Sequence, residues 1–160
     1  MKVGMRAQKW AWSLLGLIMF PAITLACTVG EHEEVIEKFL AQTLEERRSS
    51  ILQYPLEMQV ELYVNAMMRK HPPDLGLAIV VAGNGAKIIP TLIQRLSREK
   101  SEIVKLDLIA VFERMQQFGT YDVASDQRTM AFLNQQVAEM EASYWKERAS
   151  AKLKHIRGEK

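Results

Sequence analysis

The chain has 160 residues, of which 48% are hydrophobic and 25% charged, and it contains one cysteine. This length fits one domain, or one domain with an appendage. The apolar content excludes a disordered acidic or basic tail protein, and one cysteine excludes an intramolecular disulfide framework and any CxxC zinc or redox site. The net charge of +2 depends on Lys2, Arg6 and Lys9, because residues 27–160 carry 18 basic and 19 acidic side chains.

Residues 1–26 resemble a bacterial export signal. A basic start is followed by a run without charge from Trp10 to Ala26, which ends in small residues. The run has 17 residues, which is the short limit for a transmembrane helix, and Pro21 interrupts it. We therefore predict a cleaved signal peptide over 1–26, with an uncleaved membrane anchor and a buried N-terminal helix as the alternatives.

The stretch Ile23-Thr24-Leu25-Ala26-Cys27 resembles the cleavage box of bacterial lipoproteins, in which a small residue precedes the lipidated cysteine. It departs from the usual box at Thr24, where leucine is preferred. The only cysteine of the chain lies at this junction, which favours lipidation of Cys27 over ordinary signal peptidase cleavage after Ala26. The resemblance implies an exported protein, either periplasmic or anchored by lipid to the envelope, with the outer membrane among its destinations.

From Glu31 onward, apolar residues recur at helical spacing and alternating strand patterns are scarce. Prolines, glycines and polar turns divide this part into predicted helices. Only one of them, 75–82, is short enough for a buried strand to be a rival. The sequence therefore predicts an all-α fold of six or seven helices, forming a single domain over 27–160. The approximate ranges are 31–52, 56–70, 75–82, 88–96, 103–115, 126–140 and 143–156.

Residues 86–115 resemble a HEAT-type repeat, which is a hairpin of two helices. The first helix of this unit has Pro90 near its start and apolar pairs at Ile88-Ile89 and Leu92-Ile93, and the second begins near Glu102. The resemblance implies an α–α superhelix that binds other proteins. Only one clear unit is visible, whereas such a superhelix needs about three, so an ordinary hairpin in a helical bundle is the alternative.

The sequence carries no complete catalytic or metal-binding motif. His32-Glu33-Glu34 begins like a zinc-protease helix, but Ile36 stands where the second histidine is needed. Gly83-Asn84-Gly85 lacks the spacing of a dinucleotide or phosphate-binding loop, and Ser97-Arg98-Glu99-Lys100 lacks the motifs that accompany Ser-x-x-Lys enzymes. We predict no catalytic residue, cofactor or metal site. The alternative is an envelope enzyme or small-molecule binder whose site is assembled from dispersed residues.

Charge is distributed unevenly along the chain. Residues 31–61 carry eight acids and three bases, whereas 146–160 carry six bases and two acids. A basic helix over 143–157 has two interpretations: it packs against the acidic first helix, or it docks on anionic lipid or an acidic partner. We favour the first. The export signal argues against nucleic acid as a partner.

The expected function is that of a non-catalytic envelope module that binds or scaffolds another protein, with a purely structural lipoprotein as a further possibility. Such a module needs an exposed apolar groove or face between helices. We predict that Tyr63, Met67, Leu108 and Phe112 line it, because they lie on apolar stripes of the predicted helices 56–70 and 103–115.

Overall fold

A computed structural model describes residues 24–159 of the chain, with side chains from residue 30 onward. This part contains eight α-helices and two short 3-10 helices and no strand, which confirms the predicted all-α fold. The segment 75–82 is helical. The elements are α1 (Thr24–Ala41), α2 (Leu44–Ser50), η1 (Ile51–Gln53), α3 (Leu56–Arg69), α4 (Gly76–Ala82), η2 (Gly85–Ile88), α5 (Ile89–Arg98), α6 (Glu102–Phe118), α7 (Gln127–Ala138) and α8 (Tyr144–Arg157).

The predicted helix over 31–52 is divided between α1, α2 and η1, which raises the number of α-helices to eight. The break lies at Gln42 and Thr43. Thr43 begins α2 with a capping box, in which its side chain accepts from the Glu46 N–H and the Glu46 carboxylate accepts from the Thr43 N–H. The buried Arg47 donates to backbone carbonyls at the end of α1. These contacts satisfy backbone N–H and C=O groups that are left without a partner where one helix ends and the next begins.

The later helices begin and end at polar residues and glycines. Asp126 caps α7 by accepting from two backbone N–H groups of its first turn. Ser143 caps α8 by accepting from the Lys146 N–H. Gly119 ends α6 with a φ of 66°, a left-handed conformation that glycine adopts without a steric penalty.

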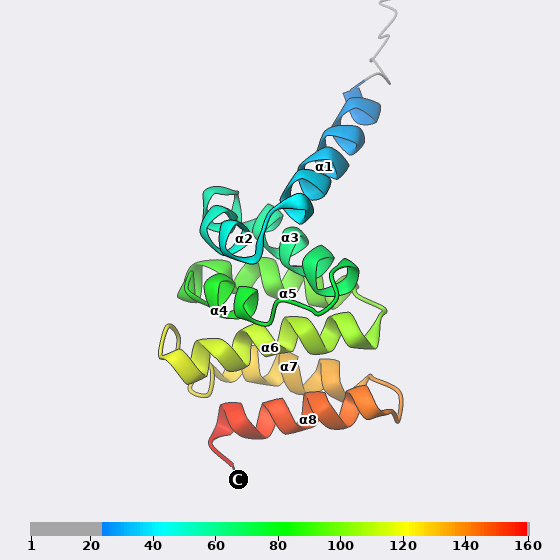
Figure 1. Cartoon of the computed structure of the whole chain (residues 1–160). Coiled ribbons are helices and arrows are strands. Elements are labelled where there is room, and N and C mark those ends of the chain that lie inside the picture. Colours follow the sequence, from blue (N-terminus) through cyan, green and yellow to red (C-terminus); the bar gives the residue numbers. More distant parts are fainter. Residues whose placement is uncertain (1–23, 160) are drawn as a thin grey trace, which may run out of the picture.

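The helices pack in two rows. We call α2, α4, α6 and α8 the even row, in which α6 packs on both α4 and α8, and α1, α3, α5 and α7 the odd row. Figure 1 shows α4, α6 and α8 following one another down the stack. Successive helical hairpins that stack on one another produce such rows. The α5–α6 hairpin occupies the region that resembles a HEAT-type repeat, and membership of that repeat family remains a prediction.

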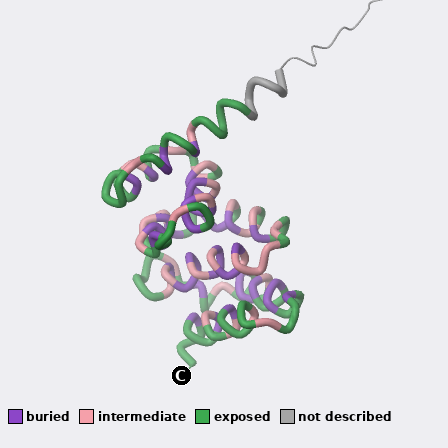
Figure 2. Tube along the Cα trace, turned by 45° about the vertical axis from the view of Figure 1, so that its right-hand side comes forward, coloured by how far each residue is buried: buried purple, intermediate pink, exposed green. Residues whose placement is uncertain are grey.

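One hydrophobic cluster runs through the stack from Ile36 on α1 to Ile156 on α8. Its large side chains lie between the rows, where Phe39 of α1 and Leu92 of α5 are fully buried. Figure 2 shows that buried residues alternate with exposed ones along the stacked helices, whereas residues 30–34 of α1 are exposed. Burial of this apolar surface is the main favourable contribution to folding.

The acidic α1 and the basic α8 lie at opposite ends of the stack (Figure 1). α1 packs on α3, where Arg69 forms ion pairs with Glu33 and Glu37. α8 packs on α6 and α7. The interpretation in which the basic C-terminal helix packs against the acidic first helix is therefore wrong, because several helices separate the two.

The predicted export signal falls almost wholly outside the described residues, which begin at 24, and the side chains of Ala26 and Cys27 lie outside them as well. Cleavage and lipidation therefore stay predictions. Within the described part, no single helix has the length and hydropathy to cross a membrane; α4 and the segment 85–98 meet these criteria only together, across a bend of 99°.

Candidate functional site

The four residues predicted to line a partner-binding face lie in or at the edge of the core. Leu108 and Phe112 on α6 are fully buried, as is Tyr63 on α3, and Met67 is 9% exposed. Leu108 and Phe112 have no exposed surface to offer a partner, so the expected apolar groove is not built from them. Tyr63 and Met67 contribute to the floor of a different feature, a hollow with a charged rim.

This hollow has a volume of about 220 Å³ and lies where α3, α4, α6 and α8 meet. Its floor is apolar. Leu75 of α4 stands at one edge, with 62% of its surface exposed. The residues of the floor are Tyr63, Met67, Ala78, Leu106 and Ala110.

Charged side chains from α6 and α8 form the rest of the rim. Asp107 and Arg114 are seven residues apart on α6, and Arg148 and Lys152 are four residues apart on α8. These spacings place each pair on one face of its helix. Because α6 and α8 are neighbours in the even row, the four side chains converge on the hollow.

A second hollow, of about 580 Å³, adjoins the first, and Arg114, Arg148 and Lys152 line both. We call the two together the α6–α8 cleft. In its second part, Glu113 accepts a hydrogen bond of 2.5 Å from Lys152 Nζ, and its other oxygen lies 2.8 Å from His155 Nδ1. Burial acts to raise the pKa of Glu113, but the hydrogen bonds with Lys152 and His155 outweigh it, so this pKa lies below its ordinary value.

Asp107 is the most perturbed carboxyl group of the cleft. Burial raises the pKa of Asp107 from 3.8 to about 6, although the nearby charge of Lys152 acts in the opposite direction. The backbone of Asp107 is fixed by Tyr63, whose hydroxyl donates to the Asp107 carbonyl at 2.8 Å. A carboxyl group that titrates near neutral pH in a hollow marks a candidate functional site.

Two guanidinium groups of the cleft lack a carboxylate partner among residues 30–159. Arg114 donates to the side-chain amide oxygen of Gln117, and the exposed Arg148 forms no hydrogen bond or ion pair with the described residues. Lys152, by contrast, is engaged by Glu113. Since a guanidinium group binds carboxylates through two parallel hydrogen bonds, the cleft is suited to an anionic ligand.

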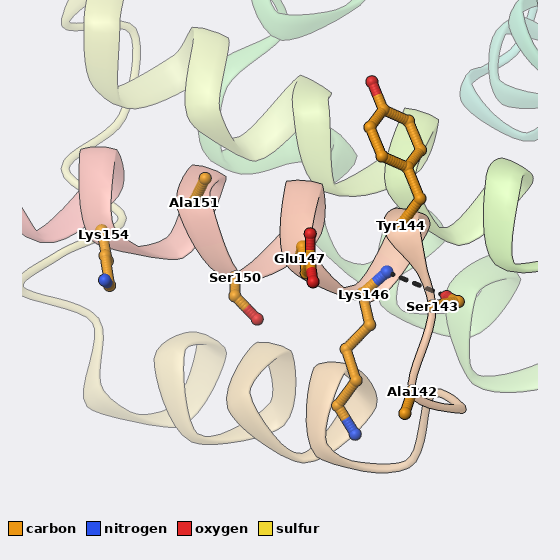
Figure 3. Close-up of a pocket in the computed structure, with 8 residues that line it drawn as sticks. All are labelled: Ala142, Ser143, Tyr144, Lys146, Glu147, Ser150, Ala151 and Lys154. Atoms are coloured by element: carbon orange, nitrogen blue, oxygen red, sulfur yellow. Dashed lines mark hydrogen bonds between the residues drawn. The ribbon is translucent and has the colours of Figure 1, made fainter.

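Other hollows offer weaker candidates. A depression of about 690 Å³ follows α8, and Figure 3 shows that Tyr144 and Lys146 point to opposite sides of this helix. Lys146 Nζ is already engaged by the carbonyls of Ala138 and Met140. A groove of about 560 Å³ between α5 and α7 is mainly apolar around Ile93 and Phe132. Neither brings two guanidinium groups without a carboxylate partner together, as the α6–α8 cleft does.

The residues that form the charged rim were not identified from the sequence. The signal that could have found them is the helical spacing of Asp107 to Arg114 and of Arg148 to Lys152, which is typical of a shared helix face. Neither spacing shows that α6 and α8 are neighbours, because α7 lies between them in the chain. The contact between the two faces is therefore a result of the tertiary packing alone.

No group of three or more histidine, cysteine, aspartate or glutamate side chains within the described residues could hold a metal ion. No protein-family model, curated protein or solved structure matches the chain.

Proposed function

We propose that the chain is an exported, non-catalytic helical module of the bacterial envelope that binds a protein partner through the α6–α8 cleft. The observation that carries this proposal is an apolar floor beside two guanidinium groups without carboxylate partners. Protein interfaces concentrate methionine and arginine side chains, and here Met67, Arg114 and Arg148 meet at one place. Met67 is held by α3 of the odd row, and the two arginines by α6 and α8 of the even row.

The location assigned to this module comes from the N-terminal sequence. A cleaved export signal over 1–26 delivers the protein to the periplasm, and lipidation of Cys27 anchors it to the envelope. In this proposal α1 connects the anchor to the stack. From Cys27 to its end at Ala41 the helix spans about 20 Å, which would hold the cleft away from the membrane surface.

A small-molecule binder or an enzyme is the second candidate, and one observation favours it. Asp107, Lys152, Glu113 and His155 bring titratable groups together at the cleft, as a ligand or catalytic site requires. The second hollow, at about 580 Å³, lies within the roughly 300–1,000 Å³ typical of such ligand pockets, whereas the apolar hollow, at about 220 Å³, is smaller. The small apolar floor and the open charged rim favour a protein segment.

Site-specific photo-crosslinking in cells that express the full chain tests the binding proposal. A photoreactive amino acid replaces Leu75 at the rim or, as a matched control, Leu52 on η1, which is 52% exposed and does not line the cleft. We expect a discrete protein adduct from position 75 that is absent from position 52 and is lost with Arg148→Glu. No adduct from position 75, or the same adducts from both positions, would contradict the proposal.

Fatty-acid labelling tests the predicted location separately. We expect label in the parent and none in Cys27→Ala. Unlabelled parent protein in the periplasm would support export and contradict lipidation of Cys27. Retention of the uncleaved parent in the cytoplasm would contradict both export and lipidation.

A further inference from the structure

We infer that the α6–α8 cleft selects an acidic segment of its partner, which places one apolar side chain on the floor and carboxylates on Arg114 and Arg148. This inference rests on the proposed function, because it names the chemistry of the protein partner at the same cleft. It is carried by the pattern of ion pairs around the cleft and by the size of the hollow.

The ion pairs leave the cleft with unused positive charge. Lys152 and His155 both contact Glu113, so this carboxylate is already satisfied within the protein. With its pKa raised to about 6 by burial, Asp107 is mostly ionised at pH 7 and offsets one positive charge of the cleft. Arg114 and Arg148, one on each side of the cleft, together outweigh it and leave an excess of one positive charge.

The size of the apolar hollow indicates which side chain lies between the carboxylates of the partner segment. The apolar hollow, at about 220 Å³, accommodates a single side chain rather than a ligand of the roughly 300 Å³ or more that fills a typical pocket. Leu75 extends the apolar surface outward from the floor on the α4 side. A segment with one apolar residue flanked by acids matches this arrangement, since the apolar residue is buried while the acids remain at the charged rim.

The acidic helix α1 of a second copy fits this description poorly. Glu33 and Glu37 are paired with Arg69, and Glu34 is paired with Lys38. Docking α1 into the cleft would require breaking pairs that the fold already makes. We therefore assign the partner segment to another protein and not to α1 of a second copy.

Peptide binding to the purified full chain tests the inference. The probes are fluorescein-labelled pentapeptides with the sequences Glu-Glu-Leu-Glu-Glu, Glu-Glu-Ser-Glu-Glu and Lys-Lys-Leu-Lys-Lys, followed by fluorescence anisotropy. We expect the acidic leucine peptide to bind at least about tenfold more tightly than the other two, and less tightly at higher salt. Arg148→Ala and Arg114→Ala should each weaken binding about tenfold, the effect expected for loss of one charge-assisted hydrogen-bonding group.

The control variant is Arg98→Ala on α5, an exposed arginine that does not line the cleft; it should bind the acidic leucine peptide as the parent does. Equal binding of the basic peptide, or unchanged binding by Arg148→Ala, would overturn the inference. Vesicles of phosphatidylglycerol that bind in an Arg148-dependent manner, with no binding of the acidic leucine peptide, would assign the cleft to anionic lipid. If the peptide fails to bind while position 75 still crosslinks to a protein, the acidic chemistry is wrong and the proposed function stands. If both are absent, both proposals fall.

Discussion

The arginines of two neighbouring sites in the stack have different surroundings. At the first site, Arg48 of α2 donates from Nε and Nη2 to Asp74, whose side chain is fully buried. Asp74 also accepts from the N–H of Gly76 at 3.0 Å, and a Cβ atom at Gly76 would lie only 2.4 Å from Arg48. This site is closed around its ion pair and holds α2 to α4.

At the α6–α8 cleft, Arg114 and Arg148 face an open hollow and have no carboxylate partner within the described residues. The residue type is the same at both sites, but only at the Arg48 site does the fold supply the anion. A buried acid partner therefore separates a cation that stabilises the fold from one that is available to a ligand.

The largest effect that we expect comes from the core beneath the cleft. Phe112→Ala removes a fully buried ring from α6 and should lower the free energy of unfolding by about 3–5 kcal/mol. Urea unfolding measures this change, with the exposed Phe118→Ala as the control at the end of the same helix. A loss below 1 kcal/mol in Phe112→Ala would show that this ring is not part of the core, and would restore it as a candidate for contact with a partner.

Loss of the Arg48–Asp74 ion pair should give the next largest change in the free energy of unfolding. Asp74→Ala leaves Arg48 without its anion and the Gly76 N–H without its acceptor. We expect a loss of about 2–3 kcal/mol in urea unfolding, less than for a fully buried pair because Arg48 is partly exposed. The exposed Glu57→Ala is the control, with a change within about 0.5 kcal/mol. Equal stability of Asp74→Ala and the parent would show that the Arg48–Asp74 pair does not stabilise the fold, and would remove its difference from the arginines of the α6–α8 cleft.

Asp107→Asn tests the unusual carboxyl group of the cleft. Because burial raises the pKa of Asp107 from 3.8 to about 6, the folded state binds a proton more tightly than the unfolded state does. This group therefore contributes stability that is fully present below about pH 4 and is lost as the pH rises to about 6. At pH 7 the variant should be more stable than the parent by on the order of 1 kcal/mol, a value reduced for the partial exposure of this side chain.

The measurement is urea unfolding of both proteins from pH 4 to pH 7. The difference between variant and parent should increase as the pH rises through this interval. A difference that stays constant would show that Asp107 has an ordinary pKa, and one that decreases would show that the carboxylate is stabilised in the fold.

The sequence was sufficient to predict most helices, because prolines, glycines and caps mark their ends. The predicted helix 56–70 is α3, and the predicted helix 143–156 is α8 shifted by one residue. The break within 31–52 was missed because apolar spacing continues across it. The helix is interrupted by the capping box that Thr43 forms with Glu46. This capping box depends on side-chain geometry, which the spacing of apolar residues does not show.

The candidate site could not be predicted in the same way. Apolar residues lie on several sides of α6, so their spacing does not show which of them are covered by neighbouring helices. Leu108 and Phe112 are covered, whereas Asp107 and Arg114 on another side face the cleft. The site also depends on the packing of α6 against α8, which follows α7 in the chain.

A direct comparison of Arg148→Ala and Arg48→Ala decides between a stabilising and a binding role for the two cations. For each variant, affinity for the acidic leucine peptide is measured together with the free energy of unfolding in urea. We predict that Arg148→Ala loses about tenfold in affinity while its stability changes by less than about 0.5 kcal/mol. Arg48→Ala should lose more stability than Arg148→Ala and keep the affinity of the parent. Unchanged affinity in Arg148→Ala, or an equal loss of affinity in both folded variants, would contradict the assignment of the α6–α8 cleft as the binding site.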